Sequence, residues 1–221
     1  MTKKLLIEGW RGINHSYAMI NQYHILGLKK LDENIYHHDL PYYSEAWNSD
    51  KNFCGFNDVT AMEIFSVPEP PPEMSIETTF RASYPLRLYP AKSKKLFVFG
   101  TSEFQALTAE MVFEGGQLGE FKDLPLKIIT PSNWSKFGFL NAGFNEDQVE
   151  VIPHGVDRSI FRVLDPSTRK QYRALFGASE EDFIILNVGA MTANKGIDVL
   201  LDAFFILFKK YQNIKLGEVL A

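Results

Sequence analysis

The sequence predicts an α/β protein with a Rossmann-like, doubly wound parallel sheet, followed by an incomplete second unit of the same kind. Two observations predict this fold. Short apolar runs, typical of buried parallel strands, alternate with longer segments of helical periodicity. The first run, residues 3–10, is also interrupted by glycine at Gly9, as expected where a strand emerges at its carboxyl end. Strands that alternate with helices indicate a parallel sheet covered by helices.

The elements follow in a regular order. A loop at residues 9–14 leads into a helix with Ser16 as the expected N-cap. Six of the eleven prolines lie between Ser66 and Pro90, which excludes a helix there but leaves room for a strand at residues 76–82. The other predicted elements of this unit are strands at 34–40, 95–99, 126–130 and 149–152, helices at 102–113 and 132–141, and a glycine-rich loop at 115–119.

A second unit begins after the last of these strands. We expect residues 1–160 to form the first domain, and residues 161–221 to form a linker and the start of the second. The linker includes a helix at 167–176, and the second domain starts with a buried strand at 183–188, a loop at 189–194 and a long helix at 195–211. One strand and one helix cannot enclose a core, so the sequence predicts a fragment or a shortened protein.

Composition narrows the function. The chain has 221 residues, is 45% hydrophobic and 14% aromatic, and so has the makeup of a folded globular protein. A net charge of −4 without blocks of like charge argues against nucleic acid as a partner. Cys54 is the single cysteine, which excludes an intramolecular disulfide and favours a reducing compartment. With no apolar run near the length of a membrane span, we expect a cytoplasmic protein, with a peripheral place at the inner membrane face as the alternative.

Two loops have the geometry of a ligand site, because each follows a predicted strand and precedes a helix N-terminus. The first contains Gly9 and Gly12, and the second contains Gly189, Lys195 and Gly196. Neither matches a dinucleotide-binding or Walker A pattern. A lysine at a helix start is unfavourable to the helix dipole, so its placement points to an anion, although a solvated lysine beside a tight turn and glycines needed only for steric reasons stay open as alternatives.

Five segments occur in an order that resembles glycosyltransferase family 4. They are residues 129–134, Gly143-Phe144, residues 149–157, Phe161-Arg162 and residues 187–204, with residues 99–103 also similar. The resemblance implies the GT-B fold, in which two Rossmann-like domains face each other across a cleft. It further implies transfer of a sugar, of hexosyltransferase type and as in polysaccharide biosynthesis, from a nucleotide-sugar donor such as a UDP- or GDP-sugar to a glycan or lipid-linked acceptor, with retention at the anomeric carbon.

The resemblance also assigns residues. Lys195 matches the family's diphosphate-contacting lysine and is the expected catalytic residue, and Gly9 and Gly12 match its N-terminal glycine loop. Gly189 and Gly196 flank that lysine in the second loop. Positive charge from a lysine and a helix N-terminus stabilises the departing diphosphate without metal. No Asp-x-Asp motif occurs in the sequence, so we expect neither a metal nor another cofactor.

Acceptor contacts are expected on the first domain, at His15, Ser16, Tyr17 and Asp39, which follow predicted strands. A capping or structural role for His15 is an open alternative. Adjacent positions on one strand prevent His37 and His38 from sharing a metal ion, and His24 is expected to be packed or solvated.

Three departures from the family pattern raise a second hypothesis. Ala190 stands where the family often has arginine, the acidic Glu-x7-Glu motif is absent, and the end of the chain is unlike the family's continuation. The alternative is therefore an inactive acceptor-binding fragment. The helix at 195–211 carries apolar residues over most of its surface, which predicts self-association or docking onto the first domain.

Overall fold

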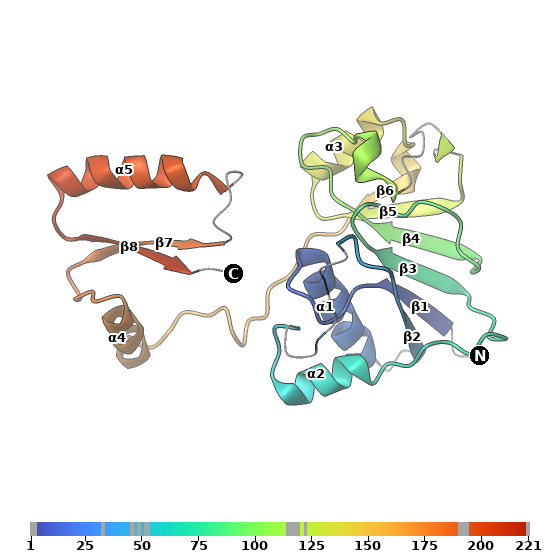
Figure 1. Cartoon of the computed structure of the whole chain (residues 1–221), viewed down its shortest axis with the longest axis horizontal. Helices are drawn as coiled ribbons and strands as arrows, with labels where there is room; N and C mark the ends of the chain where they lie inside the picture. Colours follow the sequence, from blue (N-terminus) through green and yellow to red (C-terminus); the bar gives the residue numbers. More distant parts are fainter. Residues whose placement is uncertain are drawn as a thin grey trace. The chain divides into compact units, whose positions relative to one another are not determined.

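We describe a computed structural model of the chain over residues 4–31, 34–44, 47, 50, 54–113, 120–121, 123–189 and 195–219. The chain divides into two compact units, unit 1 over Met1–Gly155 and unit 2 over Val156–Ala221 (Figure 1). The division lies close to the predicted domain boundary after residue 160. Each unit is described by itself.

Unit 1 is built on a six-stranded sheet with the order β2-β1-β3-β4-β5-β6, in which every pair of neighbours is parallel. The strands are β1 (Lys4–Gly9), β2 (Asn34–Asp39), β3 (Thr78–Ala82), β4 (Lys95–Phe99), β5 (Leu126–Thr130) and β6 (Val149–Val151). All six lie within or beside the predicted strands. The predicted doubly wound parallel sheet of the first unit is thus confirmed, including the strand that follows the proline-rich segment.

Helices cover this sheet at two places. Helix α1 (Ser16–Lys30) packs against β1, β2 and β3, and α3 (Asn133–Asn141) packs against β5 and β6 (Figure 1). Helix α2 (Asp58–Phe65), which lies beside α1, was not predicted. The N-cap of α1 is His15 rather than the predicted Ser16, because the His15 Nδ1 accepts a hydrogen bond from the Tyr17 N–H at 3.2 Å.

The predicted helix at 102–113 is wrong. This segment forms a turn, an irregular stretch and the short 3₁₀ helix η2 (Ala109–Met111). The reason lies in its pairing with the chain after β3: the Leu86 N–H donates to the Met111 carbonyl at 2.8 Å, and the Phe113 N–H donates to the Leu86 carbonyl at 2.9 Å. Groups paired in this way are unavailable for the hydrogen bonds of an α-helix. The predicted loop at 115–119 lies outside the described residues.

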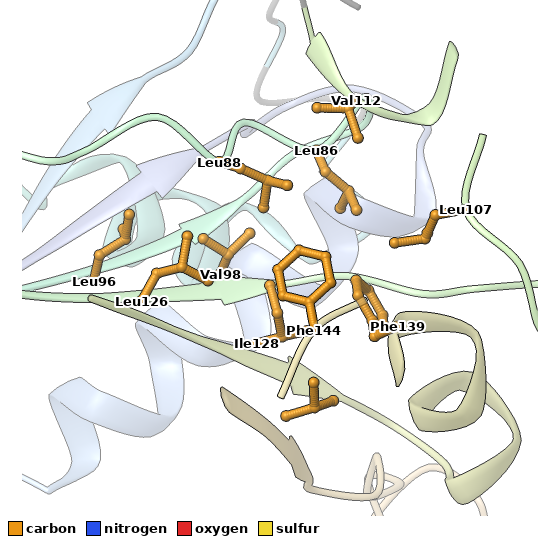
Figure 2. Close-up of a cluster of buried hydrophobic side chains, with 11 residues drawn as sticks. Leu86, Leu88, Leu96, Val98, Leu107, Val112, Leu126, Ile128, Phe139 and Phe144 are labelled. Atoms are coloured by element: carbon orange, nitrogen blue, oxygen red, sulfur yellow. The ribbon is translucent and has the colours of Figure 1, made fainter. Parts of the chain in front are cut away.

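The largest apolar core of unit 1 lies on β4 and β5. Figure 2 shows side chains of these strands gathered with Leu86 and Leu88, which follow β3, and with Phe139 of α3. Leu86, Val98, Ile128 and Phe139 are almost fully buried. A second core lies under α1 and α2 and includes Ile7, Ile25 and Ile64. The carboxyl ends of the strands therefore rest on close-packed cores, which hold the loops after them in place.

Unit 2 contains helix α4 (Pro166–Leu175), strand β7 (Phe183–Val188), helix α5 (Ile197–Lys210) and strand β8 (Ile214–Val219). The two strands are parallel and form a two-stranded sheet. The expectation that 183–188 is a buried strand is half right: the strand forms, but Phe183, Leu186 and Val188 are more than half exposed. A two-stranded sheet offers too few neighbours to bury both of its faces.

Candidate functional site

The glycine loop after β1 is shaped by its own packing. A Cβ on Gly9 would lie 2.8 Å from Asn21 Cγ and 2.9 Å from the Ala82 carbonyl oxygen, so only glycine fits there. Gly12 has a φ of +66°, and its N–H donates to Gln22 Oε1 at 3.0 Å. Both glycines are buried, and the amide of Gly12 is engaged within the unit. A contact of these glycines with a donor diphosphate stays a prediction.

His15 lies among aromatic rings just before α1. Its ring centroid is 5.2 Å from those of Trp10 and Trp47, with an edge-to-face arrangement against Trp10. Burial lowers the pKa of His15, which keeps the ring neutral at pH 7. Because Nδ1 accepts from the Tyr17 N–H, the neutral ring carries its proton on Nε2. His15 therefore has a capping role and also presents a hydrogen-bond donor at the carboxyl edge of the sheet.

The other two candidates on α1 differ in exposure. Ser16 is exposed, whereas Tyr17 is only 6% exposed. The Tyr17 hydroxyl lies 3.2 Å from Thr101 Oγ1 and accepts from the Thr101 N–H at 3.3 Å. Tyr17 thus joins the start of α1 to the segment after β4, and any acceptor contact it makes would be through this fixed hydroxyl.

Asp39, at the end of β2, is held by Arg11. The carboxylate accepts from Arg11 Nη2 at 2.5 Å and from Arg11 Nε at 3.1 Å, a two-point pairing. Arg11 is buried and also donates to the Ile64 carbonyl within α2 and to the Val67 carbonyl after it. The pair therefore braces the loop after β1 against β2 and α2. Asp39 remains half exposed, so its predicted contact with an acceptor is untested by this geometry.

Behind this brace lies a buried polar network. Asn21 Nδ2 donates to the Trp10 carbonyl at 3.0 Å and lies 2.8 Å from His37 Nε2. Burial, together with the nearby Arg11, lowers the pKa of His37 to about 3, so its ring is neutral. His38 points the opposite way, is exposed and pairs with Glu69 at 2.8 Å. The two histidines lie on opposite faces, as predicted.

Aromatic side chains that the sequence analysis did not single out complete this edge. Tyr43 follows β2 and Tyr84 follows β3, and their ring centroids lie 6.4 Å apart. Tyr84 also packs on Tyr17, at 6.1 Å. Tyr43 is 67% exposed. The sequence held a signal for them, because both tyrosines follow strands whose carboxyl ends meet at one edge of a parallel sheet.

In unit 2, the predicted lysine loop stands between β7 and α5. Lys195 is exposed, and Gly196 is the N-cap of α5 with a left-handed φ of +63°. Gly189 directly follows β7, and residues 190–194 lie outside the described part of the chain. The first turn of α5, whose N–H groups have no partner within the helix, is thus close in sequence to a cation and to the left-handed Gly196.

Three further findings concern the described residues. A cavity of about 700 Å³ lies at the amino ends of β4 and β5, lined by residues such as Lys94, Leu124 and Lys127, and so at the edge opposite to the predicted site. Over the described residues, no three His, Cys, Asp or Glu side chains gather as metal ligands would, and none of the described helices is long and apolar enough to cross a bilayer.

Similarity to known proteins agrees with this architecture. A stretch of 74 residues, 34% of the chain, is 31% identical to a mannosylfructose-phosphate synthase of Agrobacterium fabrum and covers 16% of that protein. Among solved structures, the chain is similar to Anabaena Alr3699/HepE, crystallised in complex with UDP and glucose, with a TM-score of 0.57 and 13% identity over 98% of this chain and 60% of that one. No protein-family model matches.

This likeness establishes the fold. The chain has the Rossmann-like α/β architecture that the sequence predicts. The chain spans less than two thirds of the length of either protein.

Proposed function

We propose that this chain belongs to a glycosyltransferase that moves a sugar from a nucleotide-sugar donor to a carbohydrate or lipid-linked acceptor. The observation that carries the proposal is the place of Lys195: an exposed cation that directly precedes the N-terminus of α5, after the parallel strand β7. The similarity to HepE, a protein solved with UDP and glucose, and to a mannosylfructose-phosphate synthase supports it.

The chemistry asked of Lys195 is electrostatic. When the bond between the sugar and the nucleotide diphosphate breaks, negative charge grows on the departing phosphate oxygen. The ammonium group of Lys195 and the N–H groups of the first turn of α5 are positive, so they would stabilise that charge more in the transition state than in the ground state. The resemblance to glycosyltransferase family 4 with its GT-B fold adds that the proposed reaction needs no metal ion and retains the anomeric configuration.

Unit 1 takes the acceptor side in this proposal. The carboxyl edge of its sheet holds His15, Tyr17, Tyr43 and Tyr84, whose ring contacts place them in one cluster with Trp10. Arg11 and Asp39 brace the loop beneath. An edge with a donor N–H, hydroxyls and ring faces suits a sugar, which has hydroxyl groups around an apolar C–H surface.

The test begins with donor binding to the full chain. Titration calorimetry with UDP-glucose and with GDP-mannose should give binding of at least one donor, and Lys195→Ala should weaken it about tenfold, the loss of one charge-assisted contact. Lys209→Ala is the matched control, because Lys209 lies in the last turn of the same helix and should leave binding unchanged. Equal binding by the Lys195 and Lys209 variants would contradict the role of Lys195.

The second candidate function is an acceptor-binding protein without transfer activity. The observation that favours it is the small sheet of unit 2, which is the donor side in this proposal. The described strands of unit 2 form a sheet of only two strands. Donor hydrolysis and transfer assays distinguish the two. Donor binding with release of UDP or GDP supports the enzyme, whereas sugar binding without donor binding supports the acceptor-binding protein.

A further inference from the structure

Tyr43, Tyr84 and Glu103 form a surface at the carboxyl edge of unit 1 that we call the tyrosine platform. Its members follow β2, β3 and β4; β3 and β4 are neighbours in the sheet, and β1 lies between β2 and β3. Tyr43 is 67% exposed, Tyr84 is partly exposed and Glu103 is exposed. The platform is thus open to a ligand that approaches this edge from solvent.

The platform is held in place from below. The Tyr84 ring packs on the buried Tyr17 ring, whose hydroxyl bonds to Thr101 two residues before Glu103. The backbone carbonyl of Glu103 itself accepts a hydrogen bond from Trp134 Nε1 at 3.0 Å. Backbone and ring contacts therefore fix the platform, while the Glu103 carboxylate has no part in them. A rigid aromatic surface loses little conformational entropy when a ligand binds.

Carboxylates lie near this surface, because Glu103 and Glu110 both act on the Tyr84 phenol. The pKa of the Tyr84 phenol lies above its ordinary value, first because partial burial disfavours the phenolate, and then because Glu103, Tyr43 and Glu110 are close to it. The pKa of Tyr17 is raised in the same direction, chiefly by burial, with a contribution from Glu103. The cations Arg11 and Arg87 are buried, and each is engaged elsewhere, with Asp39 and with the Phe113 ring.

We propose that the tyrosine platform binds a neutral sugar ring of the acceptor and discriminates against acceptors that carry a phosphate at this subsite. The ring faces of Tyr43 and Tyr84 match the apolar C–H surface of a sugar, and the Glu103 carboxylate accepts hydrogen bonds from its hydroxyl groups. The same carboxylate, with Glu110 nearby, repels a phosphate. This inference rests on the proposed function for its acceptor, but the binding itself does not require transfer.

The test compares two probes that differ by one phosphate, trehalose and trehalose 6-phosphate, with the full chain. Saturation-transfer NMR from the aromatic protons of the protein should reach trehalose, and the signal of trehalose 6-phosphate should be about fivefold weaker, the effect expected for exposed charges. Glu103→Gln should bring the two signals within about twofold of each other, because it keeps the shape of the side chain and removes its charge.

The tyrosines are tested by truncation. Tyr43→Ala and Tyr84→Ala should each reduce the trehalose signal, whereas Tyr84→Phe should keep it because the ring face is retained. Tyr172→Ala is the matched control, since Tyr172 is an exposed tyrosine of α4 in unit 2. Tryptophan fluorescence verifies that each variant is folded, and Tyr43→Ala serves if Tyr84→Ala unfolds. Equal signals for the two probes, or a trehalose signal that survives both truncations, would overturn the proposal.

The donor experiment separates this inference from the proposed function. If trehalose binds with the expected preference but neither UDP-glucose nor GDP-mannose binds, glycosyl transfer is refuted and the platform stands. If a donor binds and turns over while the platform variants behave like the parent chain, the transferase stands and the platform is refuted.

Discussion

The two units differ in how completely they bury their apolar residues. In unit 1, six strands and the helices beside them enclose side chains such as Val98, Ile128 and Phe139 with almost no exposure. In unit 2, the two strands and two helices leave Val188, Val199 and Ile206 more than 60% exposed. The same alternation of strands and helices therefore buries its own apolar residues only when enough strands join the sheet.

A core substitution should break unit 1 far more than unit 2. Phe139→Ala removes a fully buried ring of the core on β4 and β5, and we expect it to lower the free energy of unfolding by about 4 kcal/mol. Phe205→Ala removes a ring of α5 that is 59% exposed and should cost less than about 0.5 kcal/mol. Urea unfolding followed by circular dichroism measures both. Similar losses in the two variants would contradict the difference between the units.

Acid should also act selectively on unit 1, because all five histidines lie in it. Burial lowers the pKa of His24 to about 4 and that of His37 to about 3, so both are neutral when folded. In the unfolded chain they take up protons below about pH 6.5, so stability is complete above that pH and falls as the pH drops toward 4. We expect each of the two histidines to account for a loss of about 3 kcal/mol between pH 7 and pH 4, and so about 6 kcal/mol together.

The measurement is urea unfolding by tryptophan fluorescence, which reports on unit 1 because all three tryptophans lie there. His24→Leu should reduce the pH dependence, since the His24 ring packs against Phe80 and its Nδ1 has no hydrogen-bond partner among the described residues. His38→Gln is the control, because His38 is exposed. A pH dependence that His24→Leu leaves intact would show that other groups cause it.

Self-association tests the exposed side of the comparison. The expectation that the apolar residues of α5 are uncovered is met in part: Phe205 and Ile206 are exposed, whereas Ile197 is buried and Phe204 is half-buried. We predict that the chain associates through the exposed residues, and that Phe205→Glu or Ile206→Glu weakens association about tenfold. Leu31→Glu, at a position 72% exposed in unit 1, should not. Sedimentation equilibrium gives the constants, and a parent chain that is monomeric throughout would end this prediction.

Two glycines should give small effects of opposite sign. Gly27 lies within α1 with open space where a Cβ would go, so Gly27→Ala should stabilise unit 1 by about 0.5–1 kcal/mol. Gly196 has equal space but a φ of +63°, so Gly196→Ala should destabilise unit 2 by about 1 kcal/mol. Thermal unfolding followed by circular dichroism measures the two shifts, and shifts of the same sign would contradict the backbone argument.

The parts of the fold that could be predicted are those that depend on local pattern. Buried strands such as Leu126–Thr130 can be recognised in the sequence as short apolar runs. Ser132 caps α3, as its position directly before the helix suggests. The segment at 102–113 could not be predicted in this way, because its conformation depends on Leu86, a residue far away in the sequence that pairs with Met111 and Phe113. Helix α2 is short, and it is placed by contact with α1.

The candidate site divides along the same line. Positions such as Gly12 and Gly196, where the backbone is left-handed, could be singled out from the sequence. The partner of Asp39 could not, because Arg11 follows β1 and meets Asp39 only when β1 and β2 have paired in the sheet. The meeting of Tyr43, Tyr84 and Glu103 likewise depends on strand order, which brings the ends of β2, β3 and β4 to one edge.

The brace between Arg11 and Asp39 has a consequence for how this edge can change. The stability of unit 1 depends on the buried inner residues Arg11, Asn21 and His37. Substitutions at these positions would therefore destabilise the fold. Tyr43 and Glu103 lie outside that layer and are exposed. Surface positions of this kind tolerate exchange. A laboratory evolution library restricted to these two positions should therefore yield many folded variants with different sugar preferences. In this molecule, the residues that select the sugar can change while the residues that hold the fold stay the same.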